Sequence, residues 1–187
     1  MIVNLFGKDD EKESKIKVLR NPFISEPFYK KFKDYVLSEQ LDWHYQQYDV
    51  SEDKSAMPHY TNTLLGRPEN DIDFCRYPHP ISRLVVDACT LIQKVLEFNQ
   101  VRYNSFLRIS VNCVHPQPKV ISSESHRDHD FPHKNCIIYF TGAGGKTFVE
   151  DEKYDPKEDD AILFDGINHY MQSPLKERRI ILVSTFV

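Results

Sequence analysis

The chain has 187 residues, of which 40% are hydrophobic, and a formal net charge of -4 at pH 7. This length suits one domain with a substantial core and leaves little room for two. The acidic balance argues against broad, non-specific binding to nucleic acid or to an anionic membrane, because both favour a basic surface. No apolar run approaches the roughly 20 residues that cross a bilayer, so we expect no membrane-spanning helix.

The N-terminus and the cysteines give information about the cellular compartment. Residues 1–6 lack the basic start and the long apolar stretch of a signal peptide. The four cysteines are scattered and form no C-x-x-C pair: they are Cys75, Cys89, Cys113 and Cys136. We therefore expect reduced thiols in a cytoplasmic protein, with neither a disulfide framework nor a zinc site.

The N-terminal half predicts two helices separated by a polar segment. Residues 1–20 indicate a strand, an exposed charged turn and a second strand. Apolar residues at helical spacing predict a helix from about Glu26 to Gln40, with a short strand after it. A longer amphipathic helix is predicted over about 80–99. Residues 50–80 are polar with interleaved aromatic residues, which is typical either of a binding loop or lid or of a tolerated surface insertion.

The C-terminal half predicts strands. Alternating or continuously apolar runs indicate strands at 106–114, 135–140, 147–149, 161–164 and 180–187. Residues 151–160 read as a charged turn. Several short strands after a helical portion predict an α+β fold, a β-barrel or sandwich buttressed by N-terminal helices. We expect one domain over residues 1–187, with 1–100 as support and lid region and 101–187 as the core that carries the site.

A candidate metal site combines three separated residues. His126 and Asp128 stand two residues apart, so on a strand both side chains would point to the same face. His169 follows the predicted strand at 161–164. Two histidines and one carboxylate, with the rest of the coordination sphere open, form the ligand set of non-haem Fe(II) oxygenases. His-x-Asp alone is a weak signal, and the distal histidine makes it stronger.

The region 103–187 resembles the double-stranded β-helix (jelly-roll, cupin-like) core of the 2-oxoglutarate/Fe(II)-dependent dioxygenases, and is most similar to their prolyl-hydroxylase-like branch. The resemblance is carried by His126-Arg127-Asp128, His169, the pair Arg178-Arg179 and the turn Gly144-Gly145-Lys146-Thr147. It implies that His126, Asp128 and His169 bind Fe(II), and that Tyr139 and one arginine of the pair bind 2-oxoglutarate. It also implies O2 as co-substrate and ascorbate as the reductant.

The choice between the two arginines depends on strand faces. An arginine is required because the second carboxylate of 2-oxoglutarate would otherwise be a buried, unpaired charge. Arg179 shares a face with Ile181 and Val183, whereas Arg178 shares one with Ile180. We favour Arg179, which directly precedes the apolar run, and keep Arg178 as the alternative.

Six polar residues near the motif allow two interpretations each: Arg108, Asn112, His129, His133, Asp130 and Asp165. The two residues in the strand at 106–114 face the pocket or are half-exposed. The two histidines contact substrate or form a lid above the metal, or they belong to a polar loop. The two carboxylates orient the ligand imidazoles or are ordinary turn residues.

The implied activity is hydroxylation of a prolyl residue in a peptide or protein, or of a small molecule. Related iron halogenases lack the carboxylate ligand, so Asp128 favours hydroxylation over halogenation. The acidic balance disfavours a nucleic-acid substrate. Two alternatives remain: a cupin-like metal enzyme that does not use 2-oxoglutarate, and a non-catalytic β-helix binding module.

Overall fold

The computed structural model describes residues 14–47, 57–67 and 78–187. The expected strand in residues 1–6 lies outside these ranges, as do 50–56 and 68–77 of the polar segment. The described elements are β1 (Lys17–Leu19), α1 (Pro27–Leu37), β2 (His44–Gln46), β3 (His59–Gly66), β4 (His79–Pro80), α2 (Val85–Phe98), β5 (Phe106–Val114), β6 (Lys134–Tyr139), β7 (Thr147–Val149), β8 (Glu152–Tyr154), β9 (Ala161–Asp165), β10 (His169–Met171) and β11 (Arg179–Phe186).

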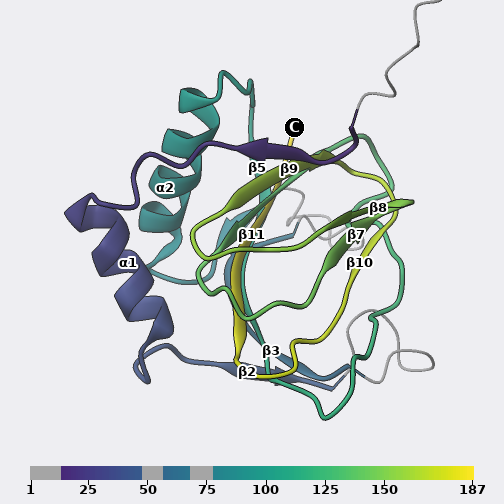
Figure 1. The fold of residues 1–187 in the computed structure, drawn as a ribbon. Coiled ribbons are helices and arrows are strands. Elements are labelled where there is room, and N and C mark those ends of the chain that lie inside the picture. The colour runs from purple at the N-terminus through teal and green to yellow at the C-terminus, as the bar shows by residue number, and fades with distance from the viewer. Residues whose placement is uncertain (1–13, 48–56, 68–77) are drawn as a thin grey trace, which may run out of the picture.

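The strands form two antiparallel sheets. The main sheet has the order β1-β9-β6-β11-β5-β3-β2, with β4 also paired to β3, and the smaller sheet has the order β10-β7-β8. Helices α1 and α2 cover one face of the main sheet, and the smaller sheet lies on its other side (Figure 1). This is the predicted α+β architecture, a jelly-roll core buttressed by helices.

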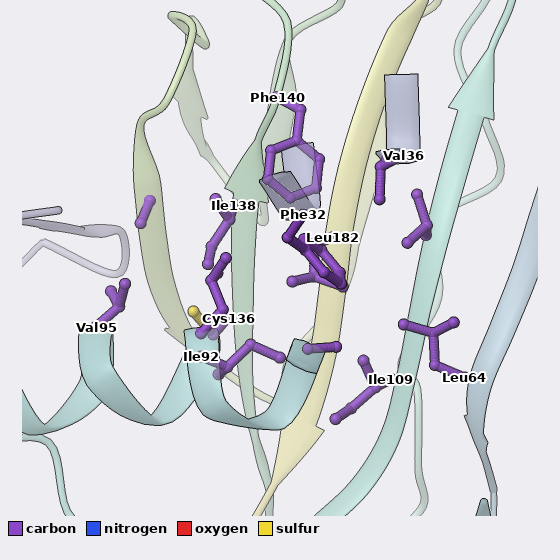
Figure 2. Close-up of a cluster of buried hydrophobic side chains, with 14 of the residues drawn as sticks. Phe32, Val36, Leu64, Ile92, Val95, Ile109, Cys136, Ile138, Phe140 and Leu182 are labelled. Atoms are coloured by element: carbon purple, nitrogen blue, oxygen red, sulfur yellow. The ribbon is translucent and has the colours of Figure 1, made fainter. Parts of the chain in front are cut away.

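Strand alternation divides the buried side chains into two clusters. On β6, Ile138 packs in the cluster that includes the helices, whereas Ile137 and Tyr139 pack in the cluster between the sheets. On β11, Leu182 likewise faces the helices and Ile181 faces the smaller sheet. Both strands are almost wholly buried because they are covered on both faces. Figure 2 shows the helix-side cluster between α2 and the central strands.

Strand β3 contradicts the expectation of a loop, lid or insertion throughout residues 50–80. It pairs with β5 and β2 and is mostly buried. The prediction was wrong here because the buried residues in the first half of the strand are polar: Thr61 Oγ1 donates to Asn112 Oδ1 at 2.8 Å, and Asn62 Nδ2 donates to the Asp42 carbonyl at 2.6 Å. These bonds offset the cost of burying polar groups, so no apolar alternation marks the strand.

Other boundaries also differ from the predictions. Helix α2 begins at Val85 and not near residue 80, because His79–Pro80 pairs with β3 as β4. Helix α1 ends at Leu37, where the hydroxyl of Ser38 donates to the Tyr35 carbonyl at 2.7 Å. Part of the charged segment 151–160 forms β8 in a hairpin with β7.

No helix in the described ranges is both long enough and apolar enough to cross a membrane. The described cysteines, Cys89, Cys113 and Cys136, are free thiols.

Leu182→Ala should lower the free energy of unfolding by about 2–5 kcal/mol, because it leaves a cavity between the sheet and the helices. Leu182 is fully buried, whereas Val86 on α2 is 68% exposed. The control Val86→Ala should change stability by less than about 0.5 kcal/mol. Urea unfolding measures both variants, and equal losses would contradict the packing of the helices on this face.

Candidate metal centre

The backbone brings His126 and His169 together as direct neighbours. The His126 amide donates to the His169 carbonyl at 3.0 Å, and the His169 amide donates back to the His126 carbonyl at 2.9 Å. The two imidazole ring centres lie 4.6 Å apart. His169 opens β10, but His126 forms only this isolated bridge and lies in no regular strand, contrary to the expectation for the His-x-Asp segment.

Local backbone carbonyls orient both imidazoles. His126 Nδ1 lies 3.1 Å from the Glu124 carbonyl, and His169 Nδ1 lies 2.9 Å from the Ile167 carbonyl. A carbonyl only accepts, so each Nδ1 carries a proton, and in the neutral tautomer that this contact selects Nε2 is the nitrogen with the lone pair.

The carboxylates considered for this orienting role do not perform it. Asp130 is exposed, and Asp165 accepts from Lys134 Nζ at 2.7 Å on the surface. Asp130 fits the interpretation as a turn residue, whereas Asp165 is the last residue of β9 and fits neither interpretation.

Asp128 is 7% exposed and is shared by two arginines. Its Oδ1 accepts from Arg67 Nη2 and from Arg108 Nη1, each at 2.9 Å. Its Oδ2 lies 3.4 Å from His169 Nε2. Burial alone would raise the pKa of the Asp128 carboxyl, but Arg108, His169, Arg67 and His126 outweigh it and hold the pKa below its usual value. The carboxyl is therefore ionised.

The three candidate ligands converge as the sequence pattern indicated. One donor atom from each of His126, Asp128 and His169 lies within 4.8 Å of the others, a spacing that could hold a metal ion. They line a cavity of about 190 Å³. Arg108 and Asn112 also line it, so the interpretation in which this strand faces the pocket is the one that fits.

The inner end of the same cavity holds Arg179, which is 1% exposed. Its Nη2 donates to Thr147 Oγ1 at 2.9 Å and its Nε donates to the Gly145 carbonyl at 3.2 Å. The Tyr139 hydroxyl lies 2.8 Å from Thr147 Oγ1, and the guanidinium carbon lies 5.3 Å from the centre of the Tyr139 ring. Burial raises the pKa of Tyr139, although Arg179 acts in the opposite direction, so this hydroxyl stays protonated.

Arg178 does not join the site. Its side chain is exposed and lies outside the cavity, whereas Ile181 and Val183 line the cavity together with Arg179. The alternative with Arg178 is therefore wrong, because the strand alternation that carries Arg179 inwards carries its neighbour outwards.

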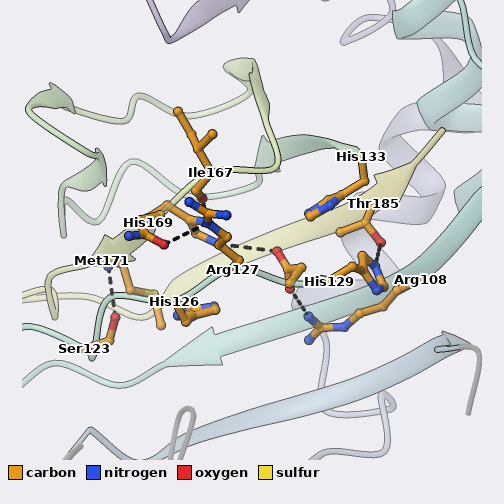
Figure 3. Close-up of polar contacts among 12 residues, drawn as sticks. Arg108, Ser123, His126, Arg127, His129, His133, Ile167, His169, Met171 and Thr185 are labelled. Atoms are coloured by element: carbon orange, nitrogen blue, oxygen red, sulfur yellow. Dashed lines mark hydrogen bonds and ion pairs between the residues drawn. The ribbon is translucent and has the colours of Figure 1, made fainter. Parts of the chain in front are cut away.

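His129 and His133 pack beside the site without lining the cavity. His129 Nε2 lies 2.8 Å from Thr185 Oγ1, and the His129 and His133 rings meet edge to face at 4.8 Å (Figure 3). Burial, with smaller contributions from His133 and Arg67, lowers the pKa of His129 to about 4. Both residues lie in the loop that precedes β6, as the loop interpretation expected, and there they pack in a cluster with Phe131.

The residue that sequence reasoning missed is Arg67, which follows β3 directly. It carried no signal because its strand was not recognised and an isolated arginine has no periodicity. Arg108 carried a weak signal, since strand alternation places it on the face of Asn112.

Gly145→Ala should destabilise the protein more than Gly144→Ala. Both residues have positive φ (78° and 76°), so alanine strains both. Only at Gly145 would the new Cβ meet other atoms, the Gln172 carbonyl oxygen at 2.5 Å and Arg179 Cδ at 3.1 Å. We expect a loss of about 1 kcal/mol for Gly144→Ala and of about 2 kcal/mol or more for Gly145→Ala by urea unfolding. Equal losses would contradict the close approach of this turn to Arg179.

No family model matches the chain, and no curated protein matches it in sequence. Solved structures do match. An oxidoreductase of the 2OG-Fe(II) oxygenase family from Burkholderia pseudomallei superposes with a TM-score of 0.68 at 10% identity, over 93% of this chain and 85% of that chain.

Two prolyl hydroxylases also match. The enzyme from Trichoplax adhaerens, solved in complex with a peptide fragment of the hypoxia inducible factor oxygen degradation domain, gives a TM-score of 0.61 at 12% identity, over 93% of this chain and 84% of that chain. A Pseudomonas putida prolyl-4-hydroxylase gives 0.52 at 13% identity, over 93% of each chain. The chain therefore has the fold of the 2-oxoglutarate/Fe(II) oxygenases and prolyl hydroxylases.

Proposed function

We propose that the protein is an Fe(II)- and 2-oxoglutarate-dependent oxygenase in which His126, Asp128 and His169 hold the metal. The observation that carries the proposal is the convergence of two imidazoles and one buried carboxylate beside a buried arginine in one cavity. Two histidines and one carboxylate suit non-haem Fe(II) and leave the remaining positions open.

The chain's own contacts prepare these three residues for a cation. Each imidazole donates from Nδ1 to a backbone carbonyl, which makes Nε2 the nitrogen that would bind the metal. Both arginines use Oδ1 of Asp128, so Oδ2, the oxygen nearer His169, is the one available for coordination.

Arg179 is the proposed partner of 2-oxoglutarate. A guanidinium binds a carboxylate by two parallel charge-assisted hydrogen bonds, and Tyr139 and Thr147 place hydroxyl groups beside it. Ile181 and Val183 give the cavity apolar walls that exclude water from the co-substrate chain. When bound, iron, 2-oxoglutarate and O2 supply the oxidising chemistry, and the protein supplies position and a dry site.

The proposed reaction is hydroxylation, with a peptide prolyl residue or a small molecule as substrate and ascorbate as the reductant in the assay. The prolyl option is supported by analogy of fold with the two prolyl hydroxylases. The buried arginine in the metal cavity favours this function over a cupin-like enzyme without 2-oxoglutarate and over a binding module without metal.

Asp128→Ala should weaken the binding of Mn(II), a redox-stable substitute for Fe(II), by more than about 100-fold. Loss of a residue that only contacts a metal ligand costs up to about 100-fold in affinity, and loss of a ligand itself should cost more. The variant removes a ligand and leaves Arg67 and Arg108 facing the cation without the carboxylate. Titration calorimetry measures the affinity, and exposed Asp130→Ala is the matched control. Wild-type protein that binds no Mn(II) would refute the metal assignment and favour the binding module.

Arg179→Gln should raise the KM for 2-oxoglutarate by about 100-fold or more, because one carboxylate of the co-substrate then lies buried without a cation. Arg178 is the exposed neighbour of Arg179, and Arg178→Gln should leave the KM for 2-oxoglutarate unchanged. The measurement is succinate release with Fe(II) and ascorbate, together with 2-oxoglutarate affinity of the Mn(II) form. If both variants keep wild-type values, an enzyme that does not use 2-oxoglutarate at this position becomes the better account.

A further inference from the structure

The cavity carries an excess of positive charge. Among the described residues, its lining contains four arginines and one carboxylate: Arg67, Arg108, Arg127, Arg179 and Asp128. A metal dication would add two further charges, and the 2-oxoglutarate dianion would remove two. Under the proposed function, the loaded site therefore still holds more cationic than anionic groups.

Three of the four arginines already have a role. Arg67 and Arg108 share the carboxylate of Asp128. Arg179 lies at the inner end, where the proposed co-substrate binds. Arg127 is the one left, and it stands between two of the candidate ligands in sequence.

The guanidinium of Arg127 is held in place through Nε, and its Nη1 and Nη2 stay open to a ligand. Its Nε donates to Asn168 Oδ1 at 3.1 Å, and the Asn168 carbonyl accepts from the Glu150 amide at 2.9 Å. Within the described ranges, its two terminal nitrogens have no hydrogen-bond partner and it pairs with no carboxylate. The side chain is exposed at the cavity and lies beside the ligand histidines (Figure 3).

We propose that the primary substrate carries an oxyanion, a carboxylate or a phosphate, and that Arg127 binds this group at the cavity mouth. The inference rests on the proposed function, because that function assigns Arg179 to the co-substrate. A guanidinium anchored through Nε presents Nη1 and Nη2 side by side, which matches two oxygens of one oxyanion. A locally positive, partly enclosed site also concentrates small anions. Arg127 would thus determine specificity, and the metal ligands would not.

The test uses the full chain loaded with Mn(II) and saturated with 2-oxoglutarate, so that Arg179 is already occupied. Inorganic phosphate and acetate are the probes, and paramagnetic relaxation of their 31P and 1H nuclei reports binding near Mn(II). We expect saturable relaxation in the wild type, and the probe with the tighter binding identifies the oxyanion. Arg127→Gln should weaken that binding by about 10- to 100-fold, because two charge-assisted hydrogen bonds are lost.

Two further variants complete the test. Arg127→Lys keeps the charge but not the paired donors, so its affinity should lie between those of the wild type and Arg127→Gln. Arg102→Gln removes an exposed arginine outside the cavity and should leave the affinity for the oxyanion unchanged. Relaxation that does not saturate, or that is equal in the wild type and Arg127→Gln, overturns the inference. Failure of Mn(II) or 2-oxoglutarate to bind in the first place instead overturns the proposed function.

Discussion

The carboxylate of Asp128 connects the parts of the chain that build the site. Arg67 at the end of β3, Arg108 on β5 and His169 at the start of β10 all meet it. A buried carboxylate without partners would cost several kcal/mol, and the two guanidinium groups offset that cost. Because the ion pairs and the backbone bridge between the histidines form within the chain itself, the arrangement of the three candidate ligands does not depend on a cation.

Packing of the helices and geometry of the cavity are linked through strand alternation. Leu182 faces α1 and α2, while Arg179, Ile181 and Val183 face the cavity from the same strand. A slip of one residue in β11 would exchange the two faces and bring Arg178 inwards. The apolar cluster against the helices opposes such a slip, so residues outside the cavity determine which arginine lines it.

Sequence patterns predicted the parts of the fold that depend on apolar periodicity. Both helices and the core strands β5, β6, β9 and β11 were predicted because apolar residues fill them. Strand β3 was not, because three of its buried side chains, His59, Thr61 and Asn62, are polar, and the partners of Thr61 and Asn62 are known only in three dimensions. The convergence of His126, Asp128 and His169 was predicted from the motif and its resemblance, and their roles as ligands stay a prediction. The role of Arg67 could not be predicted from the sequence, because no motif or periodicity in the neighbouring residues indicates it.

The sign of charge in the cavity is opposite to that of the whole chain. The protein carries a net charge of -4, yet arginines outnumber carboxylates in the described lining of the cavity. Interactions between exposed charges fade beyond about 8–10 Å at physiological salt, so the local excess acts on groups that enter the mouth. A long polyanion such as a nucleic acid would also meet the acidic remainder of the surface. The charge pattern therefore favours a compact anionic group that reaches Arg127 over a polymer that spreads across the molecule.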